Sequence, residues 1–265
     1  MRIPTAWLTR LLRRKPAGHL LTVRDDDTFI VSYPKSGNTW VRFLVANLVY
    51  GNGVDFARIE KLVPDIYQNT SRELDGVASP RYLKSHESYD PRYERAIYIT
   101  RDPRDVVVSY YYHRIKIRVI PAGADKSAFV DKFVSGRLDR FGSWGDNVGS
   151  WLAARSGDPD FLVLHYEDVL ADTAAELQRI AKFLKLDRTD TQIESAIAES
   201  SFERMRAHET AQGHRWRTTE RSRKDMYFVR SAGSGGWEKE LSDEMAQRIV
   251  RAWPQQMATL GYIDR

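Results

Sequence analysis

The sequence contains no cysteine, which excludes disulfide bonds, thiol nucleophiles and metal sites built on cysteine. A chain without cysteine fits a reducing compartment, so we expect a cytoplasmic protein. No stretch approaches the roughly 18 consecutive apolar residues of a membrane-spanning helix. The first residues also lack the apolar core of a secretory signal. These absences together argue against an integral membrane protein and against a disulfide-stabilised secreted one.

Acidic residues are missing from positions 1–24, which hold six of the 41 Lys and Arg residues of this 265-residue chain. The remainder, 25–265, therefore carries 35 basic (41 less 6) and 36 acidic side chains and is nearly neutral. A protein that binds nucleic-acid backbones needs a basic face on its folded body, so we expect no nucleic-acid partner. We divide the chain into a basic N-terminal tail or helix, 1–24, and one folded domain, 25–265.

The tail contains an amphipathic pattern, because apolar residues recur at helical spacing between Arg and Lys within positions 1–15. One interpretation is a helix in peripheral contact with an anionic membrane, at its inner face for a cytoplasmic protein. The other is a helix docked on the domain, or a loose tail.

Short β runs alternate with helical runs from residue 28 onward, and the pattern predicts a single α/β domain with a parallel sheet flanked by helices. The expected strands are Thr28–Tyr33, Tyr82–Lys84, Ala96–Thr100 and Phe161–His165. The expected helices include one from Asp102-Pro103 through Tyr112, and the amphipathic segments Ala174–Leu186 and Glu240–Leu260. Polar residues 207–226 are interpreted as a surface loop and lid. Ligands of such folds bind beyond the carboxyl ends of the strands.

The segment between the first strand and its helix has the composition of an anion site. It reads Tyr33-Pro34-Lys35-Ser36-Gly37-Asn38-Thr39-Trp40. Gly37 lets backbone N–H groups approach an oxyanion at the helix N-terminus. Lys35 adds a full charge, and Ser36, Asn38 and Thr39 add side-chain donors. The segment is not a Walker A loop, because GxxxxGK[ST] occurs nowhere in the chain.

Two further segments place reactive side chains at the same sheet edge. Arg101 follows the third strand, and Ser109 lies two helical turns later; the planar fork of Arg suits phosphate. His86 follows Lys84-Ser85 at the end of the second strand. Histidine is the commonest general base for a hydroxyl near neutral pH, which makes His86 a candidate catalytic residue.

These motifs together resemble the cytosolic-type sulfotransferases that use 3′-phosphoadenosine 5′-phosphosulfate (PAPS). YPKSGNTW is similar to that family's YPKSGTTW, with Asn38 in place of threonine and still able to donate a hydrogen bond. Arg101 and Ser109 match the family's 3′-phosphate motif, and Lys84-Ser85-His86 resembles its catalytic segment. The resemblance implies a P-loop nucleotide-kinase-like sulfotransferase fold, with His86 and Lys35 catalytic and Lys84 on the substrate side.

Weaker matches extend the expected nucleotide site. The resemblance assigns nucleotide contacts to residues 35–40 as a whole, Trp40 included, and to Arg101, Ser109, Tyr166, Ser200, Phe202, Phe228, Val229 and Arg230. The last segment departs from the family's RKGxxGDW at Ser231, Ala232 and Gly236, so one cation near the 3′-phosphate is missing. We expect Arg221, Arg223 and Lys224 of the preceding loop to be able to compensate.

The expected function is transfer of a sulfuryl group from PAPS to an acceptor hydroxyl, leaving 3′-phosphoadenosine 5′-phosphate (PAP). The acceptor is a glycan, a glycolipid, or a small alcohol or phenol, and neither its identity nor the oligomeric state follows from the sequence. No metal is expected. Two alternatives stay open at this point: a small-molecule kinase on a similar fold, and a non-catalytic nucleotide or polyanion binder.

Overall fold

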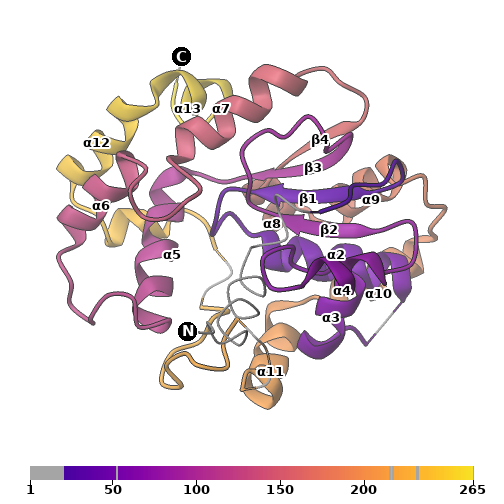
Figure 1. Ribbon diagram of the computed structural model, residues 1–265. Helices are drawn as coiled ribbons and strands as arrows, with labels where there is room; N and C mark the ends of the chain where they lie inside the picture. The colour runs from indigo at the N-terminus through magenta and orange to yellow at the C-terminus, as the bar shows by residue number, and fades with distance from the viewer. Residues whose placement is uncertain (1–20, 52, 215, 217, 231–232, 265) are drawn as a thin grey trace, which may run out of the picture.

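Four parallel strands form the centre of the molecule (Figure 1). The computed structural model describes residues 21–51, 53–214, 216, 218–230 and 233–264. The strands are β1 (Thr28–Ser32), β2 (Tyr82–Ser85), β3 (Arg95–Thr100) and β4 (Phe161–His165), in the order β2-β1-β3-β4. β1 pairs with both neighbours, Ile30 lying beside Lys84 of β2 and Ile97 of β3. The predicted α/β fold with a parallel sheet is confirmed.

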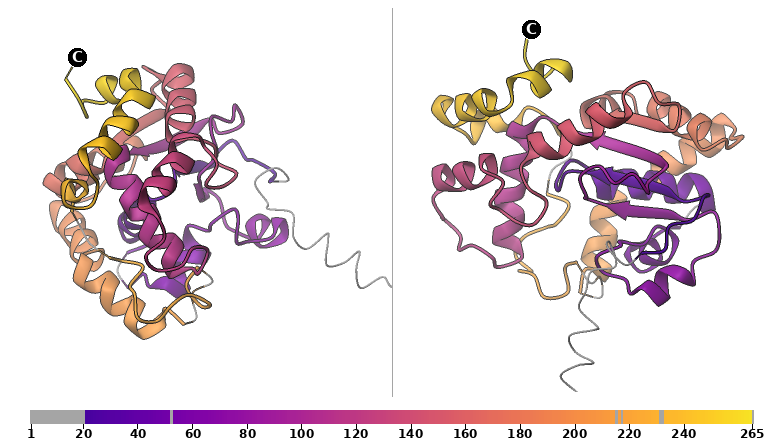
Figure 2. Two further views of the ribbon diagram at one scale, coloured as in Figure 1. Left: turned by 90° about the vertical axis from the view of Figure 1, so that its left-hand side faces the viewer. Right: turned by 45° about the horizontal axis from the view of Figure 1, so that its top comes forward.

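Helices cover both faces of the sheet because successive strand residues point to opposite sides. Phe29 and Val31 pack into one core, whereas Ile30 packs into the other. The first core contains side chains of α5 (Pro103–Lys116), α6 (Lys126–Val134), α7 (Trp144–Arg155), α12 (Asp243–Ala252) and α13 (Pro254–Thr259). The second contains those of α2 (Asn38–Tyr50), α3 (Phe56–Leu62), α8 (Tyr166–Ala171), α9 (Thr173–Phe183), α10 (Asp190–Glu199) and α11 (Phe202–Gln212). Figure 2 shows the yellow C-terminal helices beside α5 and α6 in both views.

Local sequence signals account for most helix ends. The helix boundaries expected from the sequence were wrong in two places. Asp102 caps α5 through the N–H of Arg104, and Pro103 is its first residue, as expected. The single helix expected over 240–260 is wrong, because α12 ends before Pro254 and α13 begins there. The expected loop 207–226 is partly wrong, since α11 continues to Gln212. Two short elements complete the described part of the chain, α4 (Ser71–Asp75) and the 3-10 helix η2 (Gly236–Lys239).

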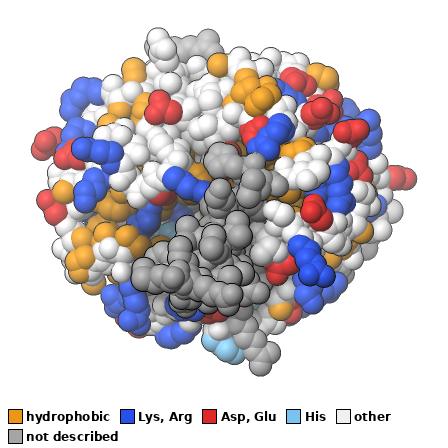
Figure 3. All heavy atoms as spheres, viewed as in Figure 1, with side chains coloured by type: hydrophobic (Ala, Val, Ile, Leu, Met, Phe, Trp, Pro, Cys, Tyr) orange, Lys and Arg blue, Asp and Glu red, His pale blue; other side chains and the backbone are white. Residues whose placement is uncertain are grey.

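The carboxyl ends of all four strands meet at one edge, and each is followed closely by a side chain singled out in the sequence. Lys35 follows β1, His86 follows β2, Arg101 follows β3 and Tyr166 follows β4. On the face shown in Figure 3, the described Lys and Arg side chains are interspersed with Asp and Glu. Within the described ranges no helix is both long and apolar enough to cross a bilayer.

Candidate active site

A pocket of about 290 Å³ opens at this edge of the sheet. Most of the predicted site residues line it: Lys35, Gly37, Asn38, Thr39, Trp40, Lys84, His86, Arg101, Ser109, Tyr166, Phe202, Phe228, Val229 and Arg230. Ser36 and Ser200 do not. The sequence analysis missed six further lining residues, Pro34, Tyr110, His113, Phe141, Met205 and Thr218. The anion motifs and His86 therefore share one cavity.

The loop between β1 and α2 presents an open helix N-terminus. Gly37 is the N-cap of α2 and no side chain caps it, so the first backbone N–H groups are left for a ligand. The Ser36 hydroxyl is buried and has no hydrogen-bond partner among the described residues. An oxyanion placed here would satisfy such donors, so the loop fits a phosphate or phosphosulfate group.

Lys35 projects into the pocket from a residue with φ of 73°, in the left-handed region. Its Nζ lies 4.2 Å from the centre of the Phe228 ring, and no described carboxylate forms an ion pair with it. Burial, and then the positive charges of Lys84, Arg101 and Arg230, together lower its pKa to about 7. The site thus gathers positive charge around Lys35, as expected for an anion-binding cavity.

Asn38 does not contribute its side-chain donors to this cradle, which corrects the expectation from the sequence. Its Nδ2 donates to the Ile30 carbonyl at 3.1 Å and to Ser32 Oγ at 3.3 Å, so the amide is directed toward β1. Asn38 can still offer its backbone N–H, because it is the first residue of α2. The Asn38 side chain therefore ties the loop to the sheet.

Gly37 is required for both its backbone conformation and its lack of a side chain. Its φ is 96°, and a Cβ atom at this position would overlap the ring of Tyr166. We expect Gly37→Ala to destabilise the fold by about 2–5 kcal/mol, combining left-handed strain and overpacking. Gly123→Ala is the matched control: φ is 80° and the space around it is open, so only about 1–2 kcal/mol should be lost. Urea unfolding of both variants measures the difference; equal losses would contradict the close approach of Tyr166.

Arg101 lines the pocket and connects the loop to the backbone at Gly233. Its Nη1 donates to the Lys35 carbonyl at 3.4 Å and its Nη2 to the Gly233 carbonyl at 2.9 Å, while its guanidinium stacks 4.2 Å over the Tyr166 ring. Its Nε is buried with no hydrogen-bond partner in the described part of the chain. Ser109 lines the same pocket from α5. These two residues can hold a second anion.

Ser200 is a support for the pocket wall, and the expected nucleotide contact of its side chain is corrected. It is fully buried, and its hydroxyl accepts a hydrogen bond from Asn47 Nδ2 at 3.0 Å. Its carbonyl accepts one from Trp40 Nε1, also at 3.0 Å. Trp40 does line the pocket, and its ring meets that of Tyr166 edge to face. Ser200 therefore fixes the orientation of Trp40.

The segment 228–230 is held in place by α11 and α5, through residues that the sequence analysis did not identify. Glu209 accepts from the N–H groups of Phe228 at 2.5 Å and Val229 at 2.9 Å, and Lys116 lies 3.3 Å from the same carboxylate. Arg206 donates to the Val229 carbonyl at 3.1 Å. These contacts fix the backbone next to the aromatic wall of the pocket.

The cations proposed to replace the missing lysine are engaged elsewhere. Arg223 pairs with Asp225, Lys224 donates to carbonyls of its own loop, and Arg221 is almost fully exposed beside Glu220. None of the three lines the pocket, so the expected compensation is wrong for this arrangement. Positions 231 and 232 lie outside the described residues, whereas Arg230 lines the pocket and stacks over Tyr112.

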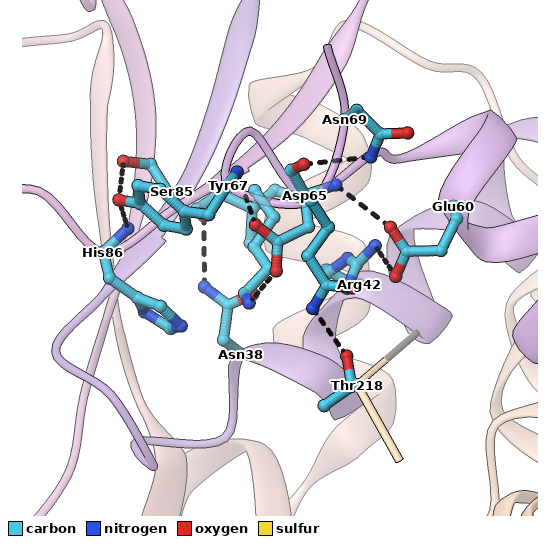
Figure 4. A network of polar contacts seen from close by, with 12 residues as sticks. Asn38, Arg42, Glu60, Asp65, Tyr67, Asn69, Ser85, His86 and Thr218 are labelled. Atoms are coloured by element: carbon cyan, nitrogen blue, oxygen red, sulfur yellow. Dashed lines mark hydrogen bonds and ion pairs between the residues drawn. The ribbon is translucent and has the colours of Figure 1, made fainter. Parts of the chain in front are cut away.

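His86 is held in the tautomer that a base requires. Its Nδ1 lies 2.7 Å from the Ser32 carbonyl, which can only accept, so Nδ1 carries the hydrogen and Nε2 keeps a free lone pair. Its backbone N–H donates to the Tyr67 hydroxyl at 2.7 Å (Figure 4). Burial, followed by the charges of Lys84 and Lys35, holds its pKa well below 6.5. The imidazole is therefore neutral at pH 7.

Lys84 lines the pocket next to His86 and is anchored by a carboxylate. Asp65 is buried, and its Oδ2 lies 2.5 Å from Lys84 Nζ. Its backbone N–H donates to Glu60, which also pairs with Arg42 from α2, so a charged network supports this wall (Figure 4). Asp65 thereby supplies Lys84 with a counter-ion in the wall beside His86. No group of three or more metal-ligating side chains occurs in the described chain.

Comparison with known proteins agrees with this geometry. The family model described as "Sulfotransferase domain" matches residues 25–261. Sulfotransferase 1B1 of Canis lupus familiaris is 30% identical over 253 residues, covering 89% of this chain and 84% of its own. Sulfotransferase 1 family member D1 of Rattus norvegicus is 29% identical over 252 residues, covering 88% and 84%.

Solved structures agree with the fold. The mouse sulfotransferase SULT7A1 complexed with PAP superposes with a TM-score of 0.77 at 23% identity, covering 93% of this chain and 89% of that one. A retinol dehydratase in complex with retinol and PAP gives a TM-score of 0.75 at 20% identity, covering 94% and 86%. The chain therefore belongs to the sulfotransferase family and is a PAPS-dependent sulfotransferase.

Proposed function

We propose that this enzyme sulfates a hydroxyl group of a small-molecule acceptor, with His86 as the general base and Lys35 as the main stabiliser of developing negative charge. The observation that carries the proposal is the fixed tautomer of His86, whose Nδ1–H is bound to the Ser32 carbonyl inside the cavity that also contains Lys35. A base and an anion cradle in one pocket are what transfer of a charged group to a hydroxyl requires.

The donor would occupy the two anion sites described above. The N-terminus of α2, Ser36 and Lys35 suit the 5′-phosphosulfate, and Arg101 with Ser109 suits the 3′-phosphate. The rings of Trp40, Phe202 and Phe228 offer apolar faces for the adenine. PAPS supplies the sulfuryl group, and the chain's own residues bind and orient it.

The acceptor side requires proton removal and charge stabilisation. Nε2 of His86 would take the proton from the acceptor hydroxyl as its oxygen attacks the sulfur. Lys35 would stabilise negative charge that grows on the sulfuryl oxygens and on the leaving phosphate oxygen. Lys84, held by Asp65, would orient the acceptor beside His86. Positioning and electrostatics then account for the rate, as in phosphoryl transfer.

We favour a small alcohol or phenol over a glycan or glycolipid as the acceptor, because the similar retinol dehydratase is described in complex with retinol, a small alcohol. The sequence of residues 1–15, which lie outside the described part of the chain, supports peripheral contact with the inner face of a membrane from a cytoplasmic location. Neither alternative function is favoured: a kinase would be expected to carry a Walker A loop, and a non-catalytic binder has no use for a base fixed like His86.

Donor binding tests this proposal directly. PAP should bind without magnesium in isothermal titration, and Arg101→Ala should weaken it about 10–100-fold through the loss of a charge-assisted hydrogen bond of roughly 1.5–3 kcal/mol. Arg104→Ala is the matched control, because Arg104 pairs with Asp102 and does not line the pocket. Mass analysis should then detect a sulfated product from PAPS and an acceptor panel. Preferential binding of ATP with magnesium would refute the proposal.

A further inference from the structure

A second imidazole reaches the pocket from α5. His113 lies four residues after Ser109 on the same helix face, and both line the cavity. Its ring packs edge-on against Phe228 with centroids 5.6 Å apart, and lies 6.3 Å from the Tyr110 ring. Its Nδ1 is buried and has no hydrogen-bond partner in the part of the chain that the structure describes. A buried polar atom of this kind is uncommon, and a ligand that bonds to it gains a specific contact.

His113 differs from the groups that suit the donor. Burial, and then the charges of Lys35, Arg114 and Lys84, lower its pKa well below 6.5, so it is neutral at pH 7. A neutral imidazole is a poor counter-ion for phosphate, but it offers one hydrogen-bond donor and one acceptor. His113 lines the same cavity as Lys84 and His86, so an acceptor held at His86 shares this cavity with it.

The part of the lining that is not assigned to the donor has few free polar groups. Phe141, Tyr110 and Met205 present mainly apolar surface. The Thr218 hydroxyl accepts a hydrogen bond from Gln68 Nε2 at 2.7 Å, and the Lys84 ammonium pairs with Asp65. His113 is thus a polar side chain on a mostly apolar wall, and its Nδ1 has no hydrogen-bond partner within the described structure. A site built to bond a substrate group rejects analogues that lack it by factors of up to about 10⁴–10⁵.

We propose that His113 hydrogen-bonds a second polar group of the acceptor, so that the enzyme selects molecules with two hydroxyl groups over those with one. This inference deepens the proposed function and rests on it: one hydroxyl lies at His86 and receives the sulfuryl group, while the other lies at His113 and does not react. His113 is a specificity-determining residue here, and it exchanges no proton with the reacting atoms.

Matched phenols test the proposal on the PAP-bound protein. The probes are catechol, resorcinol, hydroquinone and 4,4′-dihydroxybiphenyl, with phenol and 4-phenylphenol as monohydroxy partners. In isothermal titration, at least one diol should bind 10-fold or more tightly than its partner. His113→Phe should abolish that advantage while changing the affinity for the monohydroxy partner less than 3-fold. His113→Gln, which retains hydrogen-bonding atoms, should restore part of the advantage.

Two control measurements show whether His113→Phe affects only the contact with the acceptor. Thermal unfolding and PAP affinity should be unchanged in His113→Phe, since the proposal assigns His113 no contact with the donor. The proposal is overturned if wild type shows no diol advantage, or if that advantage persists in His113→Phe. It is also overturned if His113→Phe weakens both phenol classes equally or loses PAP affinity. Because binding is measured with PAP, the test is separate from turnover: a wild-type protein that forms no sulfated product refutes the proposed function instead.

Discussion

Replacing His86 with asparagine is expected to lower kcat by about 10²–10⁴-fold, the usual contribution of a positioned general base. The asparagine amide can still donate a hydrogen bond toward the Ser32 carbonyl, so the local structure should be retained while the basic Nε2 is lost. PAP affinity should change less than about 2-fold, because the base contacts the acceptor and not the nucleotide. Steady-state kinetics and titration with PAP measure the two effects separately.

The pH dependence gives this prediction a second readout. Since the pKa of His86 is lowered well below 6.5, the base is already deprotonated at pH 7, and activity should fall only as the solution becomes acidic enough to protonate it. That acid limb should disappear in His86→Asn. His165→Asn is the control, because His165 ends β4 and does not line the pocket. Near-normal turnover of a folded His86→Asn enzyme would remove His86 from the mechanism.

The sequence was sufficient to place the strands and the candidate catalytic groups, for a physical reason. Buried parallel strands appear as short apolar runs, and ligands of such sheets bind where the runs end. Lys35, His86 and Arg101 each follow a run, so their meeting in one pocket could be predicted. The start of α5 could be predicted too, because Asp102-Pro103 is a local signal that needs no tertiary information.

Side-chain direction and loop contacts depend on tertiary structure and could not be predicted in this way. Asn38 and Ser200 have donors and acceptors that suit a ligand, but these form hydrogen bonds with buried groups of the protein instead. Glu209 resembles any other charged residue of a surface helix until the fold brings Phe228 and Val229 to its carboxylate. The position of His113 in the pocket could have been predicted, since its spacing of four residues from Ser109 places both on the same helix face.

Replacing Lys35 with methionine should reduce kcat by about 10²–10³-fold and also weaken PAP binding, because the lysine charge acts on both the bound donor and the transition state. Methionine keeps the length and the apolar packing against Phe228 while removing the charge. Lys35→Arg is the matched variant: it keeps a permanent charge and should retain more of the PAP affinity than methionine does. The two variants together separate the effect of charge from that of side-chain volume.

The lowered pKa of Lys35 makes donor binding dependent on pH. With a pKa of about 7 before the donor binds, roughly half of the Lys35 side chains are neutral at that pH. A bound phosphate favours the charged ammonium, so Lys35 should take up a proton on binding, and affinity should fall as pH rises above 7. Calorimetry in buffers of different ionisation enthalpy measures this uptake at pH 7.5. PAP contributes the same titrating groups when it binds Lys35→Arg, but the arginine has no neutral form at this pH. Subtracting the proton uptake of this variant from that of wild type therefore gives the uptake by Lys35 itself. Equal proton balances in wild type and Lys35→Arg would mean that Lys35 is already fully charged in the free enzyme.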